Sequence, residues 1–193
     1  MRRALDAYLT PSWQTRALLR HQPINGVVLE PCAGDGGIAR VILDECKPDG
    51  GVYTNDINEW CNAADSHWDA ALDEMQVAIG AVDWIVTNPP YTQPVCRDIV
   101  MQSVKHARVG VAMLLRLSFL EPTAKKNPRG PWLKDNPPSR ILVLPRHSYT
   151  QDGKSDSCTT AWMIWLKRRP WFSKTPCIEC LHDADVVYGD PLG

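Results

Sequence analysis

The sequence predicts an α/β fold with a doubly wound, mainly parallel sheet. Short apolar runs rich in valine and isoleucine alternate with segments of helical spacing along most of the chain. This alternation is typical of parallel strands joined by crossover helices. Near the C-terminus two apolar runs are joined by a polar loop without a helix, which indicates an antiparallel pair. We therefore expect an antiparallel strand at the end of the sheet.

The expected elements follow one another in a regular order. Helices are expected where apolar residues recur every three or four positions, and strands where short runs are apolar and β-branched. The expected helices cover 12–19, 38–43 and 95–104, and the expected strands cover 26–30, 51–56, 83–86, 109–115, 140–145 and 158–166. Residues 58–75 have a mixed pattern, and a strand near His67 and Trp68 would place Asp69 beyond its carboxyl end.

Bulk properties limit the architecture and the classes of function. A chain of 193 residues that is 44% hydrophobic fits one domain over 1–193. Periodicity is lost after Pro170, so 171–193 is expected to be an irregular tail. The net charge of −1 excludes a global basic field, so any nucleic-acid surface must be local. Seven cysteines without a signal peptide or a long apolar segment favour a reducing cytoplasm and no membrane role.

A glycine-rich loop follows the first expected strand. Glu30 ends that strand, and Gly34 and Gly36 lie in a loop of small residues that opens into a helix. Such a loop lets the backbone approach a ligand, and the helix N-terminus offers unpaired N–H groups. Asp56 ends the second strand, where an acid can hold a ribose diol. The pattern predicts a nucleotide-type cofactor site; a dinucleotide is the rival interpretation, weakened by the missing third glycine.

The stretch Asn88-Pro89-Pro90-Tyr91 stops a buried strand and turns the chain outward. The Asn88 side-chain carbonyl and the Pro89 backbone carbonyl could accept both hydrogens of an exocyclic amino group, such as N6 of adenine. Tyr91 could stack on the heterocycle. The structural alternative is a tight Pro-Pro turn capped by asparagine and packed by tyrosine.

A local basic surface is expected over 121–140, which holds five prolines, five Lys or Arg residues and Trp132. Positive side chains with an aromatic ring suit phosphate contacts and base stacking; a solvated proline-rich connection is the alternative. The polar loop from Arg146 to Ser157 follows a strand, and its His147 is more commonly structural or phosphate-binding than a general base. The candidate substrate-binding residues are Tyr91, Lys125, Lys126, Arg129, Trp132, Arg146, His147, Tyr149 and Lys154.

Cysteine patterns give weaker signals. Cys177 and Cys180 form a Cys-x-x-Cys, but zinc needs about four ligands and no second pair stands elsewhere, so no metal is expected. Cys32 follows a proline, as does the thiol nucleophile of cytosine-C5 methylation. It lies inside the glycine loop, however, and we interpret it as a backbone contact.

Together, the loop from Glu30 to Gly37, Asp56 and the Asn-Pro-Pro-Tyr turn resemble the motifs of S-adenosylmethionine-dependent DNA amino-methyltransferases, especially small phage and prophage N6-adenine enzymes. The resemblance implies a Rossmann-like class I fold with seven strands, the last antiparallel, and a duplex DNA partner with a flipped adenine. It implies that Tyr8, Thr10 and Pro11 fold over the cofactor. It also implies that Asp69 lies near the cofactor's adenine and that Tyr149 helps to hold the base. The candidate cofactor-binding residues are Tyr8, Thr10, Pro11, Glu30, Cys32, Ala33, Gly34, Gly36, Asp56, Ile57, Asp69 and Asn88.

The sequence differs from the family it resembles in that no separate target-recognition domain is expected. The segment 121–140 is the candidate replacement. The acceptor also stays open, because RNA adenine, cytosine N4 and a glutamine amide are similar planar amino groups. A non-catalytic protein that binds nucleic acid or S-adenosylmethionine is a third interpretation. Target sequence and oligomeric state are not predicted.

Overall fold

The structure is a computed structural model that describes residues 9–59, 61–73, 80–121, 127–146, 158–168 and 176–182. Its strands are β1 (Val28–Glu30), β2 (Val52–Thr54), β3 (Trp84–Thr87), β4 (Gly110–Arg116), β5 (Arg140–Val143), β6 (Thr160–Leu166) and β7 (Cys177–Cys180). Its helices are α1 (Ser12–His21), α2 (Gly37–Cys46), α4 (Val95–His106) and α5 (Arg129–Asp135), with a short 3₁₀ helix, η1 (Leu117–Leu120).

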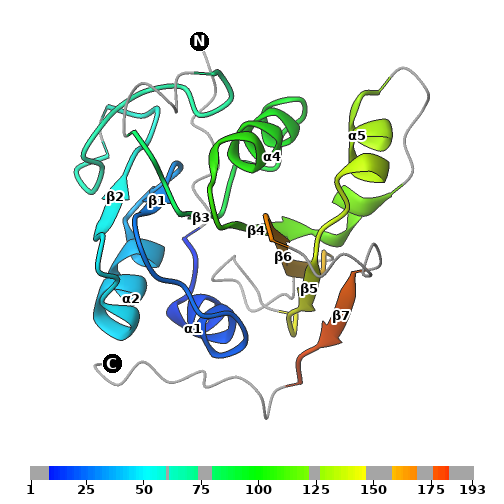
Figure 1. The fold of residues 1–193 in the computed structure, drawn as a ribbon, viewed down its shortest axis with the longest axis horizontal. Coiled ribbons are helices and arrows are strands. Elements are labelled where there is room, and N and C mark those ends of the chain that lie inside the picture. The colour runs from blue at the N-terminus through cyan, green and yellow to red at the C-terminus, as the bar shows by residue number, and fades with distance from the viewer. Residues whose placement is uncertain are drawn as a thin grey trace.

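The strands form one seven-stranded sheet in the order β2-β1-β3-β4-β6-β5-β7 (Figure 1). Strand β6 runs antiparallel to β4 and β5, and the other neighbours are parallel. The predicted doubly wound α/β class, with a mainly parallel seven-stranded sheet, is confirmed. The antiparallel strand is β6, which is sixth in chain order and lies inside the sheet, with β7 following it.

Apolar side chains on the strands alternate between two cores, one on each face of the sheet. In β6, Trp162 and Ile164 enter one core, and Met163 and Trp165 enter the other. Successive side chains of a strand point to opposite faces, so strands covered on both faces read as continuous apolar runs. Helices α1 and α2 cover the first face, and α4 and α5 cover the second (Figure 1).

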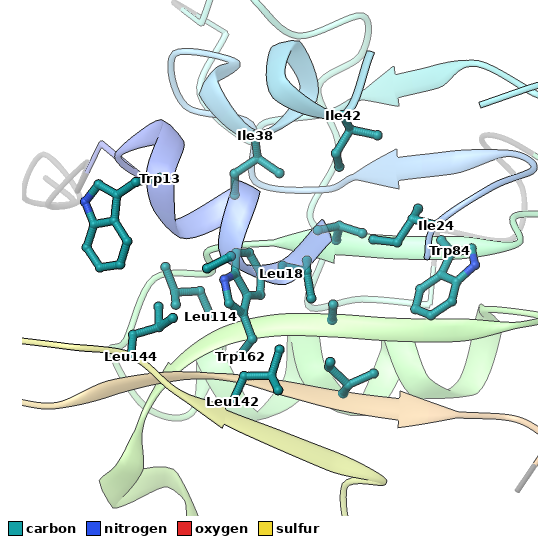
Figure 2. Close-up of a cluster of buried hydrophobic side chains, with 14 of the residues drawn as sticks. Trp13, Leu18, Ile24, Ile38, Ile42, Trp84, Leu114, Leu142, Leu144 and Trp162 are labelled. Carbon is teal, nitrogen blue, oxygen red and sulfur yellow. The ribbon is translucent and has the colours of Figure 1, made fainter. Parts of the chain in front are cut away.

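The core beneath α1 and α2 brings together residues from both halves of the chain. Figure 2 shows Leu18 of α1 and Ile42 of α2 pointing toward the same side of the sheet as Trp162. The Trp162 side chain has no exposed surface, and its indole N–H donates to the backbone carbonyl of Gln14 at 2.7 Å. This contact ties α1, and with it the arm that precedes α1, to the centre of the sheet.

The parallel strands β1, β2, β3 and β4 end at one edge of the sheet, which we call the carboxyl edge. Their last residues are Glu30, Thr54, Thr87 and Arg116. The opposite, amino edge carries the loops before β1, β3 and β4. Open α/β sheets bind ligands outside the carboxyl ends of their strands, and both the glycine loop and the Asn88 turn leave from the carboxyl edge.

Three expectations need correction. Part of the expected irregular tail forms β7, which pairs with β5 through backbone hydrogen bonds. Its sequence of two cysteines, Ile178 and Glu179 has no apolar alternation that would indicate a strand. No strand forms near His67 and Trp68; Ser66 makes only an isolated bridge with Asn55. Within the basic segment 121–140, residues 129–135 form α5, because Trp132 and Leu133 pack against the second core.

In the described part of the chain, no helix is both long and apolar enough to cross a bilayer. The seven cysteines all lie in that part, and all are free thiols.

Candidate functional site

The glycine loop joins β1 to α2 at the carboxyl edge. Gly34 and Gly36 have φ angles of +53° and +75°, a left-handed conformation that strongly favours glycine. A Cβ built on Gly34 would meet no atom within 4 Å, so the space above this residue is open. The Gly36 N–H donates to the Ala33 carbonyl at 2.7 Å and closes the turn. The loop is therefore open at Gly34, directly before the N-terminus of α2.

Glu30 stabilises the first turn of α2 through a hydrogen bond to its backbone. Its carboxyl group is buried, and Oε2 accepts a hydrogen bond from the Ala39 N–H at 2.8 Å. Burial raises the pKa of Glu30 well above its ordinary value, and the Ala39 N–H opposes this only in part. One carboxyl oxygen is thus committed to the fold, and the cofactor contact expected of Glu30 stays a prediction.

Asp56 lies beside the glycine loop, just after β2. Its Oδ2 accepts from the Gly34 N–H, and its Oδ1 accepts from the Asn58 N–H, both at 2.9 Å. A carboxylate offers about four acceptor sites, so two hydrogen bonds leave capacity for hydroxyl donors such as a ribose diol. Ile57, the next residue, is exposed and adds an apolar side chain at this position.

Asn55 is a buried polar residue that the sequence interpretation missed. Its Nδ2 donates to the carbonyls of Pro31 and Trp68, at 3.0 and 3.1 Å, and its Oδ1 accepts from the Trp68 N–H at 2.9 Å. These bonds hold the segment containing Asp69 next to the loop after β1. The sequence signal for this role was a polar residue at the end of an apolar strand. A buried amide at such a position needs hydrogen-bond partners from neighbouring segments.

The Asn88 turn begins one residue after β3. The register of β1 and β3 pairs Leu29 with Ile85, so the chain beyond Thr87 runs next to the glycine loop. The Thr87 hydroxyl lies 3.5 Å from the Cys32 carbonyl. Pro89 is buried, whereas Asn88 and Tyr91 are half-buried. The two motifs that the sequence singled out are therefore neighbours in space.

Thr10 lies between these two motifs. Its hydroxyl accepts a hydrogen bond from the Asn88 Nδ2 at 3.0 Å, and its carbonyl would lie 3.5 Å from a Cβ on Gly37. The Pro11 carbonyl accepts from the Gln14 N–H at 3.0 Å, which begins α1. The described end of the N-terminal arm thus contacts both motifs, and its expected place over the cofactor stays a prediction; Tyr8 lies outside the described residues.

Arg116 is a second residue that sequence reasoning did not select. It ends β4, and its guanidinium lies over the Tyr91 ring, 4.9 Å from the ring centroid. Strands β3 and β4 are neighbours, with Thr87 opposite Met113, and this brings the end of β4 to the Asn88 turn.

The structure describes four of the expected substrate-binding residues, namely Tyr91, Arg129, Trp132 and Arg146. Trp132 packs against Trp165, with ring centroids 6.2 Å apart, and Trp165 pairs with Val111 near the amino edge. Trp132 therefore contacts the second core through Trp165, and its expected base stacking stays a prediction. Arg129 lies over the Phe119 ring, and Arg146 is exposed beyond β5. The remaining candidates, Lys125, Lys126, His147, Tyr149 and Lys154, lie outside the described residues.

A pocket of about 400 Å³ lies between α4, α5 and the end of β6, away from the glycine loop. Met101, Gln102, Trp132 and Lys167 line it, and none of the expected cofactor-binding residues does. It lies toward the amino edge, because Lys167 follows β6 opposite the start of β4. We assign the candidate site to the carboxyl edge, where the polar groups and the open glycine loop converge.

The cysteine patterns do not form reactive or metal-binding groups in the described part of the chain. In β7, Cys177 and Cys180 are three strand positions apart, so they lie on opposite faces and about 10 Å from each other. No described group of three or more His, Cys, Asp or Glu side chains is placed to hold a metal ion. Burial raises the pKa of the Cys32 thiol, which disfavours the thiolate needed of a nucleophile.

Comparison with known proteins supports a fold assignment. No protein-family model matches the sequence, and no curated protein sequence matches it. Among solved structures, it resembles a Listeria monocytogenes protein assigned to the class I S-adenosylmethionine-dependent methyltransferases, with a TM-score of 0.57 and 13% identity over 88% of this chain and 62% of that one. It also resembles the methyltransferase subunit of a type I restriction-modification system from Streptococcus thermophilus. That comparison has a TM-score of 0.59 and 13% identity, over 88% of this chain and 45% of that one.

A dimethyladenosine transferase from Plasmodium falciparum gives a TM-score of 0.52 at 13% identity, over 79% of this chain and 60% of that one. The chain therefore spans less than two thirds of the length of each of these three proteins. Identities this low establish the fold alone. The fold is that of the Rossmann-like class I S-adenosylmethionine-dependent methyltransferases.

Proposed function

We propose that this protein transfers a methyl group from S-adenosylmethionine to the exocyclic N6 amino group of adenine in DNA. The observation that carries the proposal is the meeting of the Asn88 turn with the glycine loop, with Thr10 between them. An acceptor held at Asn88 would then lie beside a cofactor held at the loop. The structural neighbours that are S-adenosylmethionine-dependent or restriction-modification methyltransferases support the same activity.

The residues of the loop fit S-adenosylmethionine. The open space at Gly34 and the N-terminus of α2 accommodate a polar ligand close to the backbone. Asp56 can accept hydrogen bonds from ribose hydroxyls while it holds the Gly34 N–H. When bound, S-adenosylmethionine supplies an electrophilic methyl group on a positively charged sulfur.

The chain's own part in the chemistry is to orient the acceptor. The Asn88 amide donates to Thr10 through Nδ2, so the acceptor atom of this side chain is Oδ1. The Oδ1 atom and the Pro89 carbonyl can then accept the two amino hydrogens of adenine, which favours a nitrogen lone pair directed at the methyl group. Tyr91 would stack on the base. Extruding the base from a duplex costs roughly a few kcal/mol, and positioning supplies most of the rate.

The test is methyl transfer from labelled S-adenosylmethionine to DNA, followed by digestion to nucleosides. We expect the label in N6-methyladenine and near-complete loss of transfer in Asn88→Ala, with cofactor affinity nearly intact. Asn25→Ala is the control, since Asn25 lies at the amino edge and bonds Asp49. Label only in cytosine, RNA or protein would overturn the DNA-adenine assignment. Cofactor binding without transfer to any acceptor would indicate a non-catalytic binder.

A further inference from the structure

Arg116 is held against the Asn88 turn by its stack on Tyr91. It is the last residue of β4, its side chain is half-buried, and its guanidinium carbon lies 4.9 Å from the Tyr91 ring centroid. A cation over an aromatic face at this distance is attracted by the ring quadrupole. The stack therefore holds the guanidinium at one position on the carboxyl edge.

Among the described residues no acidic side chain pairs with Arg116, whereas five other described arginines form ion pairs with acidic side chains. Those with an acidic partner are Arg16 with Glu45, Arg40 with Asp35, Arg97 with Asp98, Arg108 with Asp83 and Arg140 with Glu179. A half-buried guanidinium without a counter-ion keeps its charge available to an incoming anion. Stacking leaves the N–H donors at the rim of the guanidinium plane, in the fork that matches phosphate oxygens.

We propose that Arg116 binds a phosphate of the acceptor strand next to the base stacked at Tyr91, and thereby selects a nucleic acid over a protein as the methyl acceptor. This inference rests on the proposed function and assigns the selectivity of that site to one residue. A nucleic acid carries one phosphate for every nucleotide, so an anion always accompanies the acceptor base. A glutamine amide in a protein brings no obligatory charge, and Arg116 would be left unpaired beside it.

Arg146 extends the same positive surface. Strands β4 and β5 are both antiparallel to β6, which lies between them, so β4 and β5 end at the same edge. Arg146 follows β5 and is exposed, and Arg116 ends β4. Two strand spacings separate these strands by about 10 Å. A phosphate chain running along the carboxyl edge can therefore contact both arginines.

The experiment compares Arg116→Met and Arg116→Lys with the wild-type full chain. The measurements are the KM for DNA in methyl transfer, the dependence of DNA affinity on salt, and the Kd for S-adenosylmethionine. Arg108→Met is the matched control, because Arg108 is an exposed arginine at the amino edge. Thermal melting of each variant verifies that it is folded.

We expect Arg116→Met to raise the KM for DNA about 10-fold and to reduce the slope of log affinity against log salt by about 0.9, the value of one phosphate contact. Arg116→Lys should restore the slope and only part of the affinity, because it keeps the charge and loses the planar fork. Arg108→Met should match the wild type. Affinity for S-adenosylmethionine should be unchanged in every variant.

Two results would overturn the inference while leaving the proposed function intact. One is a folded Arg116→Met variant with wild-type KM and salt slope. The other is a variant whose loss is confined to S-adenosylmethionine affinity, which would make Arg116 a ligand of the cofactor. If the wild-type protein methylates RNA, the same measurements with RNA apply. A wild-type protein that methylates only protein would overturn both the inference and the proposed function.

Discussion

The side-chain amide of Asn88 donates a hydrogen bond of 3.0 Å to the hydroxyl of Thr10, across 78 positions of the chain. This bond joins the arm before α1 to the turn after β3. It also constrains the Asn88 side chain, because Nδ2 must stay within hydrogen-bond distance of the Thr10 hydroxyl. Thr10 thus acts on the proposed reaction through Asn88, as a positioning residue.

Replacing Thr10 by valine should therefore lower the turnover of methyl transfer. The change keeps the side-chain shape and removes the acceptor of the Asn88 hydrogen bond, which is worth about 1 kcal/mol, or roughly 5-fold in rate. Thr10→Ser keeps the hydroxyl and should stay within about twofold of the wild type. Steady-state kinetics should show the loss in kcat with little change in the KM for the cofactor. Equal kcat in the valine and serine variants would remove Thr10 from the positioning of Asn88.

Replacing Asp56 by alanine should weaken S-adenosylmethionine binding more than transfer at saturating cofactor. The variant loses the acceptor of the Gly34 N–H together with the proposed ribose contact, and two such hydrogen bonds correspond to a loss of about 10-fold or more in affinity. Isothermal titration of the cofactor measures the change. Asp49→Ala is the control, because Asp49 bonds Asn25 at the amino edge. Wild-type affinity in Asp56→Ala would argue against a ribose contact.

Replacing Glu30 by glutamine should change how stability depends on pH. Burial raises the pKa of Glu30, so the folded protein retains a proton that the unfolded chain loses above its ordinary pKa near 4.5. The folded state then binds more protons, and the free energy of unfolding falls as pH rises through this window. Glu30→Gln removes that fall, so its free energy of unfolding should depend less on pH than that of the wild type.

Chemical denaturation of the wild type and Glu30→Gln at pH 5 and pH 8 measures the difference in slope. The glutamine NH₂ is buried and adds a cost that does not vary with pH, so the slope is the informative quantity. Asp44→Asn, an exposed change on α2, should leave the slope as in the wild type. Parallel pH profiles for wild type and Glu30→Gln would show that the Glu30 pKa is ordinary.

Replacing Glu179 by glutamine should give the opposite pH dependence. The Arg140 hydrogen bond, with a smaller contribution from His21, holds the pKa of Glu179 below its ordinary value near 4.5. The ion pair of Glu179 with Arg140 stabilises the folded state at pH values above 4.5. This stabilisation is lost as the pH falls through the lower pKa that Glu179 has in the folded state. For a partly exposed pair it is about 1 kcal/mol or less.

Thermal melting at pH 7 should therefore show a small loss of stability in Glu179→Gln, and the two proteins should converge toward pH 3. Arg140→Gln and the double variant complete a cycle that isolates the pair. Additive losses in that cycle would mean that Arg140 and Glu179 do not hold β7 to the sheet together.

The elements of the fold could be predicted because their causes are local. A run such as 109–115 is apolar throughout because β4 is covered on both faces, and the predicted bounds differ from Gly110–Arg116 by one residue at each end. The conformations of the glycine loop and the Asn88 turn are likewise fixed by glycine and proline within a few residues. The strand β7 was missed because its pairing with β5 depends on backbone hydrogen bonds and on the ion pair of Glu179 with Arg140, not on an apolar pattern in its own sequence.

By itself, the amino-acid sequence determined the α/β class, the two motifs and their order, since each follows from backbone freedom and apolar spacing over short stretches. Only the tertiary structure decided which distant side chains meet. It joined Thr10 to Asn88, laid Arg116 over Tyr91 and buried Asn55 behind the glycine loop. It also packed Trp132 against Trp165. These contacts depend on strand order and register, and short-range patterns carry no information about which strands become neighbours.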